Sequence, residues 1–171
     1  MTSEFKAAGD VIYLLGKTYD ELGGSELYTL FGELGANVPK VRKEQAKQCY
    51  LKVMQANKQR LIESSHDLSD GGLAVALAES TFGTNLGVEI TIDPMKNLRI
   101  PAILFSESHS RFLVSIQSKN RTLFESIMGE DAVYLGVITE ESQLIVRKGH
   151  QKIIDLPTKN ILDAWDRGLE I

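Results

Sequence analysis

The sequence has 171 residues, a length that usually forms one domain and can bury a hydrophobic core without disulfide bonds or metals. Hydrophobic residues make up 43% and charged residues 25%, and the formal net charge is −4. A mildly acidic chain is a poor general binder of nucleic acid or of anionic membranes. The longest apolar runs are far shorter than the roughly 20 residues of a membrane span, so we expect neither nucleic acid nor membrane as a partner.

Cysteine content and the N-terminus bear on the cellular compartment. One cysteine excludes an intrachain disulfide and any zinc site built from several cysteines of this chain. The first residues lack the basic and then apolar pattern of a secretory signal. We therefore expect a reducing, cytoplasmic setting. Because Cys49 falls on the apolar side of a predicted helix, we expect its thiol to be a small core group.

In the first half of the chain, apolar patterns predict one strand and two long helices. A short strand at 11–15 ends at Gly16, and a glycine-rich stretch then leads into a short helix or turn that runs to Gly35. Helical spacing of apolar residues predicts a helix over 42–62. A second helix over 73–82 is apolar nearly all round, so it needs cover on more than one face, from this chain or from outside it.

The second half contributes most of the predicted sheet. We interpret the connection from about residue 86 to 117 as hairpin-like, and Trp165 as a packing anchor. Because adjacent strands also occur without a helix between them, the expected fold is α+β: a layered mixed sheet flanked by helices, ferredoxin-like in part. The predicted elements are strands at 88–93, 102–105, 111–117, 133–139, 143–146 and 153–155, and helices at 121–128 and 159–168.

An acidic turn before the second long helix is the most informative stretch for function. Asp67 and Asp70 could share a hard cation such as Mg²⁺, which prefers carboxylate oxygens. Gly71 and Gly72 would expose backbone N–H groups at a helix start, where a phosphate is favoured. The simpler interpretation is that Asp70 caps the helix while Asp67 or Ser69 closes a turn, and both interpretations can hold at once.

A second glycine-rich turn, at 21–25, has neither a dinucleotide-binding nor a P-loop pattern. Backbone N–H groups at Gly23 and Gly24 could cradle an anion, with the hydroxyl of Ser25 added. On pattern alone, an ordinary junction between a loop and a helix is the better interpretation.

A third polar segment, 105–111, is expected between two strands, where a rigid scaffold often places binding or catalytic side chains. Glu107 could bind a metal or a substrate hydroxyl, and Ser106 and Ser108 could hydrogen-bond the same ligand. The alternative is a solvated hairpin turn. The three histidines lack the paired spacing of a metal site, and the sequence contains no pattern from which we would assign a catalytic residue.

Three segments in this order, 16–28, 66–73 and 105–111, together resemble the phosphoribosylformylglycinamidine synthase family, synthetase subunit II, and within it the last domain. The resemblance extends to a superfamily that includes aminoimidazole ribonucleotide synthetase, selenophosphate synthetase, thiamine-monophosphate kinase and a hydrogenase maturation protein. It implies an ATP- and Mg²⁺-dependent ligase of purine biosynthesis. The formamide oxygen of formylglycinamide ribonucleotide would be phosphorylated, and ammonia would then displace phosphate to give the amidine.

The same resemblance implies partners and site residues. The chain would be the last quarter of a longer polypeptide, with the remaining domains, a glutaminase subunit and a small accessory subunit as partners. Asp67 stands where the family has a Mg²⁺-binding aspartate, 106–108 stand near a substrate loop, and 23–25 stand at a phosphate-binding loop. The substrate loop continues Ser108-His109 here, where the family pattern has Ser-Gln.

Taken alone, such a domain is expected to be inactive, because it supplies at most part of a phosphoryl-transfer site. Two alternatives remain open: a non-catalytic domain that completes the assembly and clamps a nucleotide, and the second domain of another superfamily member such as a small-molecule kinase. Every site prediction requires Asp67, Asp70 and Glu107 to come together in space.

Overall fold

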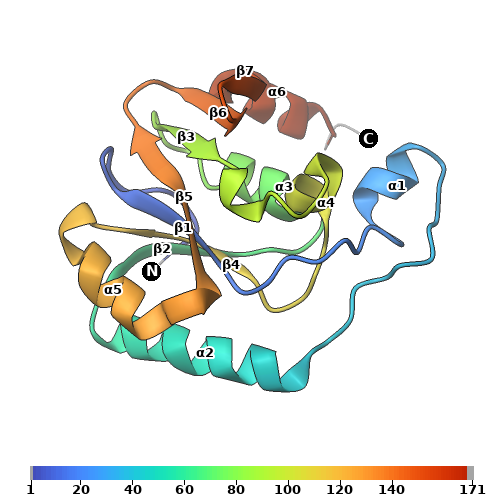
Figure 1. Ribbon diagram of the computed structural model, residues 1–171. Coiled ribbons are helices and arrows are strands. Elements are labelled where there is room, and N and C mark those ends of the chain that lie inside the picture. The colour runs from blue at the N-terminus through green and yellow to red at the C-terminus, as the bar shows by residue number, and fades with distance from the viewer. Residues whose placement is uncertain (1, 169–171) are drawn as a thin grey trace.

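A computed structural model describes residues 2–168 and shows a mixed sheet between two layers of helices (Figure 1). The strands are β1 Val11–Leu15, β2 Ile62–Asp67, β3 Gly87–Thr91, β4 Phe112–Ile116, β5 Ala132–Thr139, β6 Gln143–Lys148 and β7 Gln151–Pro157. The helices are α1 Glu26–Leu30, α2 Lys43–Lys58, α3 Gly72–Glu79, α4 Ile100–Phe105, α5 Arg121–Met128 and α6 Thr158–Gly168. The predicted α+β class is confirmed.

The sheet runs in the order β2-β4-β1-β5-β3-β6-β7, and its neighbouring strands are antiparallel except for β3 and β6. Part of the fold is a ferredoxin-like unit, with α2 and α5 together on one face. Its elements in chain order are β1, α2, β2, β4, α5 and β5, and α3, β3 and α4 are inserted between β2 and β4. The predicted ferredoxin-like part is therefore confirmed. The remaining strands β3, β6 and β7 extend the sheet beyond β5.

Strand β1 explains why both faces of the sheet carry helices. All five of its residues are buried. Ile12 and Leu14 point into a core shared with α3 and α4, whereas Tyr13 points into a second core shared with α2 and α5. Cys49 of α2 belongs to that second core at 2% exposure, as expected, and burial raises the pKa of its thiol to about 11.

The apolar helix α3 receives its cover within this chain. It packs against α4, α6 and β4. Trp165 of α6 lies beside Phe82, with ring centroids 5.7 Å apart, although the tryptophan remains 46% exposed. A Cβ on Gly72 would lie 2.5 Å from the carbonyl oxygen of Ser106, so glycine permits the close approach of the loop after α4. Within residues 2–168, no helix is long and apolar enough to cross a membrane.

The prediction of a strand at 102–105 is wrong, because these residues complete helix α4. Pro101 lies in the first turn of that helix, where its missing N–H is not needed and its fixed φ angle suits the helix. The prediction of a hairpin between 86 and 117 is also wrong. Helix α4 lies between β3 and β4 in the chain, and β1 and β5 separate these two strands in the sheet. The sequence analysis missed strand β2, because its polar sequence is typical of a loop. The helix expected over 42–62 ends at Lys58.

Candidate functional site

The three polar segments singled out in the sequence meet at the start of α3. Glu107, in the loop between α4 and β4, provides the link. Its Oε1 accepts hydrogen bonds from the backbone N–H groups of Gly71 and Glu26, both at 2.9 Å. One carboxylate oxygen therefore joins the N-terminal ends of α3 and α1, where the helix dipoles favour negative charge.

Asp67, Asp70 and Glu107 line one hollow of about 570 Å³, which we name the acidic hollow. Asp67 and Asp70 are exposed at its rim, and Asp67 accepts a hydrogen bond from the hydroxyl of Ser69 at 3.3 Å. Within residues 2–168, no three His, Cys, Asp or Glu side chains are spaced to hold a metal ion. The structure thus brings the three carboxylates to one hollow, and a complete Mg²⁺ site would need oxygen ligands from elsewhere.

The N–H groups expected to bind a phosphate before α3 already have partners. The N–H of Gly71 donates to Glu107, and that of Gly72 donates to the carbonyl oxygen of Ser69 at 3.1 Å. The N-cap position is Gly71, with φ +73°, so the interpretation of Asp70 as the cap is wrong. A distant carboxylate satisfies this helix end instead, which local sequence patterns do not reveal.

The glycine-rich turn at 21–25 is also closed by the chain itself. Gly23 donates its N–H to the carbonyl oxygen of Asn37 at 2.9 Å, and Gly24 donates to that of Leu34 at 2.7 Å. Ser25 is fully buried and caps α1, since its hydroxyl accepts from the N–H of Tyr28 at 3.3 Å. The interpretation as a junction between a loop and a helix is confirmed.

Ser106 and Ser108 point into the protein, and both are fully buried. Their hydroxyls lie 2.9 Å apart, and that of Ser108 donates to the carboxylate of Glu21 at 2.7 Å. The alternative of a solvated hairpin turn is therefore wrong. In this arrangement the two serines hold the loop in place and do not line the acidic hollow.

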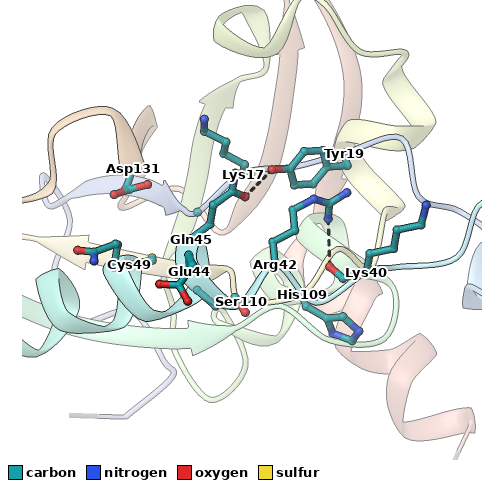
Figure 2. A pocket seen from close by; sticks show the side chains of 13 residues that line it. Lys17, Tyr19, Lys40, Arg42, Glu44, Gln45, Cys49, His109, Ser110 and Asp131 are labelled. Atoms are coloured by element: carbon teal, nitrogen blue, oxygen red, sulfur yellow. Dashed lines mark hydrogen bonds between the residues drawn. The ribbon is translucent and has the colours of Figure 1, made fainter.

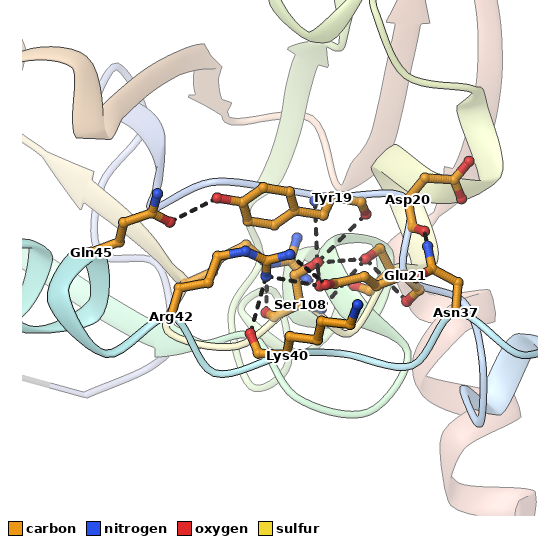
Figure 3. Close-up of polar contacts among 10 residues, drawn as sticks. Tyr19, Asp20, Glu21, Asn37, Lys40, Arg42, Gln45 and Ser108 are labelled. Carbon is orange, nitrogen blue, oxygen red and sulfur yellow. Dashed lines mark hydrogen bonds and ion pairs between the residues drawn. The ribbon is translucent and has the colours of Figure 1, made fainter.

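Glu21 is the centre of the polar network beneath that loop (Figure 3). Its side chain is 2% exposed and pairs with the guanidinium of Arg42 at 2.7 Å, which in turn lies 3.4 Å from the centre of the Tyr19 ring. Burial of the Glu21 carboxyl raises its pKa, but the hydrogen bonds from Arg42 and Ser108 and the charge of Arg42 outweigh burial. The pKa of Glu21 is therefore below its ordinary value.

Arg111 is a buried cation at the end of the same loop, 1% exposed. Its Nε donates to the carbonyl oxygen of Ser108 at 2.8 Å, its Nη1 to the hydroxyl of Thr18 at 3.0 Å, and its Nη2 to the carbonyl oxygen of Ser106. Burial lowers the pKa of Arg111 to about 10, which leaves it charged at neutral pH. Glu21 and Arg111 were missed as candidates, because a charged residue that becomes buried by distant contacts has no local sequence signal.

A second, smaller hollow of about 260 Å³ lies on the other side of the loop, lined by Lys17, Lys40 and Arg42 among others (Figure 2). His109 and Ser110 line both hollows, so the loop forms the wall between them. Glu44 and Asp131 also line the smaller hollow and Arg111 also lines the acidic hollow, so both hollows carry charges of both signs. The exposed carboxylates of Asp67 and Asp70 can supply part of a site for a divalent cation, and the chain alone does not complete it.

This fold belongs to a known class of domain. The chain matches the family described as AIR synthase related protein, C-terminal domain, over residues 7–149, and it belongs to that family. It is 38% identical over 168 residues to the phosphoribosylformylglycinamidine synthase subunit PurL of Thermococcus sibiricus, covering 94% of this chain and 23% of the relative. The resemblance inferred from the three motifs is confirmed.

Two solved structures from Thermotoga maritima show the same fold. PurL complexed with FGAR matches with a TM-score of 0.80, and PurLQS matches with a TM-score of 0.76, each at 20% identity and over 94% of this chain. The matched regions are 29% and 27% of those chains. This chain therefore spans about a quarter of the length of these relatives.

Proposed function

We propose that this chain serves as the last domain of a phosphoribosylformylglycinamidine synthase. The synthase would use ATP and glutamine-derived ammonia to convert the formamide of formylglycinamide ribonucleotide to an amidine. The observation that carries the proposal is the 38% identity to the Thermococcus sibiricus PurL over nearly the whole chain, which favours the synthase over a small-molecule kinase. The partners expected from the resemblance, a glutaminase and a small accessory subunit, and the cytoplasmic setting are part of the same proposal.

Within that enzyme, the chain's contribution centres on the acidic hollow. Asp67 and Asp70 would supply carboxylate oxygens to a Mg²⁺, with the remaining ligands from other domains or from the nucleotide. Such a cation would neutralise phosphate charge when bound. The wall of the hollow is held by Glu107, Ser106 and Ser108. Because their side chains hydrogen-bond within the domain, their role in this arrangement is structural.

The test is to replace Asp67 and Asp70 by Asn in the complete synthase that carries this domain. We expect ATP turnover with formylglycinamide ribonucleotide and ammonia to fall at least tenfold, with an unchanged melting temperature. Asp166→Asn on α6 is the matched control, an exposed carboxylate remote in sequence from the hollow residues, and it should leave turnover unchanged. Unchanged turnover in the double variant would contradict a catalytic contribution. The isolated chain is expected to show no turnover.

The second candidate function is a non-catalytic domain that clamps a nucleotide and completes the assembly. The observation that favours a non-catalytic role is that the N–H groups at 23–25 and 71–72 already have partners inside the domain, so a clamped nucleotide would be held through a cation at Asp67 and Asp70. In that case the Asp67→Asn and Asp70→Asn double variant would lose thermal stability in the presence of ATP and Mg²⁺ while retaining turnover.

A further inference from the structure

The segment from α1 to Asn37 has its apolar side chains on the outside. No residue of the five-residue helix α1 is buried. Leu30, Phe31 and Leu34, which we name the apolar cap, are 79%, 71% and 77% exposed. Isolated exposed apolar residues are normal on a protein surface, but here three large ones fall within five residues of one short segment.

Two side chains of the same segment, Tyr28 and Asn37, are hydrogen-bonded to the rest of the domain. Arg99 donates to both carboxylate oxygens of Asp20, with its Nε 2.9 Å from Oδ2, and its Nη2 lies 3.4 Å from the hydroxyl of Tyr28. The side chain of Asn37 donates to the backbone oxygen of Asp20. These contacts anchor the segment to the domain, while Leu30, Phe31 and Leu34 stay exposed together with the polar residues Glu26, Thr29 and Glu33.

The backbone of this segment holds the cap outward. Gly35 lies so close to the ring of Tyr28 that a Cβ there would overlap it, and Gly35 has φ +67°. The N–H of Gly24 donates to the carbonyl oxygen of Leu34 at 2.7 Å, which ties the turn to the glycine-rich loop. Because these contacts fix the turn, the cap cannot fold back onto the domain without breaking them.

We propose that the apolar cap docks against an apolar face of another domain of the same polypeptide, an inference that rests on the proposed function. The relatives that this chain matches are about four times as long, so such domains are present in them. Figure 1 shows α1 at the periphery, set apart from the sheet. Its first residue, Glu26, lines a hollow of about 340 Å³ together with Asp70 and Gly71, so the segment that carries the cap begins at the acidic rim.

Hydroxyl-radical footprinting read by mass spectrometry tests this docking, because it reports the solvent exposure of individual leucine and phenylalanine side chains. The two samples are the 171-residue chain and a chimaera, namely the Thermococcus sibiricus PurL with its matched region replaced by this chain. We expect oxidation of Leu30, Phe31 and Leu34 to fall at least threefold in the chimaera. Leu123 of α5 and Leu156 of β7, which are 48% and 47% exposed, should be oxidised equally in both.

Three results would overturn the proposal. The cap could remain as reactive in the chimaera as in the chain, or Leu123 and Leu156 could be protected to the same degree. Protection that grows with concentration in the chain alone would assign the cap to a second copy. Turnover of the chimaera is measured separately, so an active chimaera with an oxidisable cap refutes the docking and leaves the proposed function standing.

A triple variant, Leu30→Ser, Phe31→Ser and Leu34→Ser, gives a second measurement. In the chain alone it should shift the melting temperature by less than about 2 °C, because the side chains have few contacts to lose. In the chimaera it should lower the melting transition of this domain by about 4 °C or more. A large loss in the chain alone would show that the cap is part of the domain's own core, and no loss in the chimaera would show that nothing covers it.

Discussion

Two neighbouring polar regions of this domain are built in opposite ways. In the network beneath the loop 106–111, Glu21 and Arg111 are 2% and 1% exposed and have hydrogen-bond partners from several segments of the chain. At the rim of the acidic hollow, Asp67 and Asp70 are exposed to water. The two regions share the loop that carries Glu107, which borders the hollow and caps two helices.

The difference separates charges that hold the fold from charges that a ligand can use. A buried charge that loses its partner is strongly destabilising, so the network tolerates little change. An exposed carboxylate contributes little to stability, so the rim can be altered without unfolding the domain. If this distinction is correct, substitutions in the two regions should differ by several kcal/mol in their effect on the free energy of unfolding.

The largest effect is expected from Arg111→Met. The substitution leaves the carbonyl oxygens of Ser106 and Ser108 without their donors in a buried position. We expect the free energy of unfolding to fall by about 3 to 5 kcal/mol, measured by urea denaturation. The control is Arg147→Met, which removes a partly exposed pair with Glu89 and should remove less than about 1 kcal/mol. Equal losses in the two variants would contradict the distinction.

Glu21→Gln should have the next largest effect, and the effect should depend on pH. Since the pKa of Glu21 is below its ordinary value of 4.5, the unfolded state binds more protons and the ionised group stabilises the folded state above that pH. We expect a loss of about 1 to 3 kcal/mol at pH 7. The difference between wild type and variant should shrink as the pH falls below 4.5 and Glu21 becomes protonated in both states.

Urea denaturation at a series of pH values measures this profile, with Glu140→Gln as the control at an exposed carboxylate. The control should match wild type across the range. A loss for Glu21→Gln that stays constant down to pH values well below 4.5 would show that the carboxylate charge is not what stabilises the network.

Glu107→Ala should have an intermediate effect, because this residue belongs to both regions. The variant loses the acceptor for the N–H groups of Gly71 and Glu26. Loss of a cap typically lowers stability by about 1 to 2 kcal/mol. Glu107→Gln keeps a neutral acceptor and should recover part of the loss, as thermal melting can determine. If neither variant loses stability, the caps do not depend on this side chain.

The sequence predicted the parts of the fold that depend on local pattern. The apolar run at 11–15, the amphipathic helix from Lys43 and the apolar helix α3 all appear with small errors at their ends. The prediction of a strand at 102–105 was wrong because a short apolar run suits a buried strand and a buried helix equally well. Only Pro101, in the first turn of α4, favours the helix over the strand. The prediction missed strand β2 because a serine takes one of its two buried positions, where Ser64 and Ser115 hydrogen-bond each other at 2.6 Å.

The candidate site was predictable in part for a similar reason. Asp67, Asp70 and Glu107 do reach one hollow, because glycine and acidic residues in short turns mark strand and helix ends. The partners of Glu107 were not predictable. They come from residues 36 and 81 positions away in the sequence, and one sequence carries no record of such long-range pairs.

The smallest effect on stability is expected from Asp67→Asn combined with Asp70→Asn. Both side chains are exposed, and asparagine keeps an oxygen that can accept the hydrogen bond from Ser69 to Asp67. The free energy of unfolding should therefore change by less than about 0.5 kcal/mol in either direction, as measured by urea denaturation of the 171-residue chain. The charge at the rim changes by two units while the fold stays intact, so any loss of turnover in the complete enzyme is attributable to ligand contact. A loss comparable with that of Glu107→Ala would place these aspartates in the structural network and would remove the basis for assigning them to a cation.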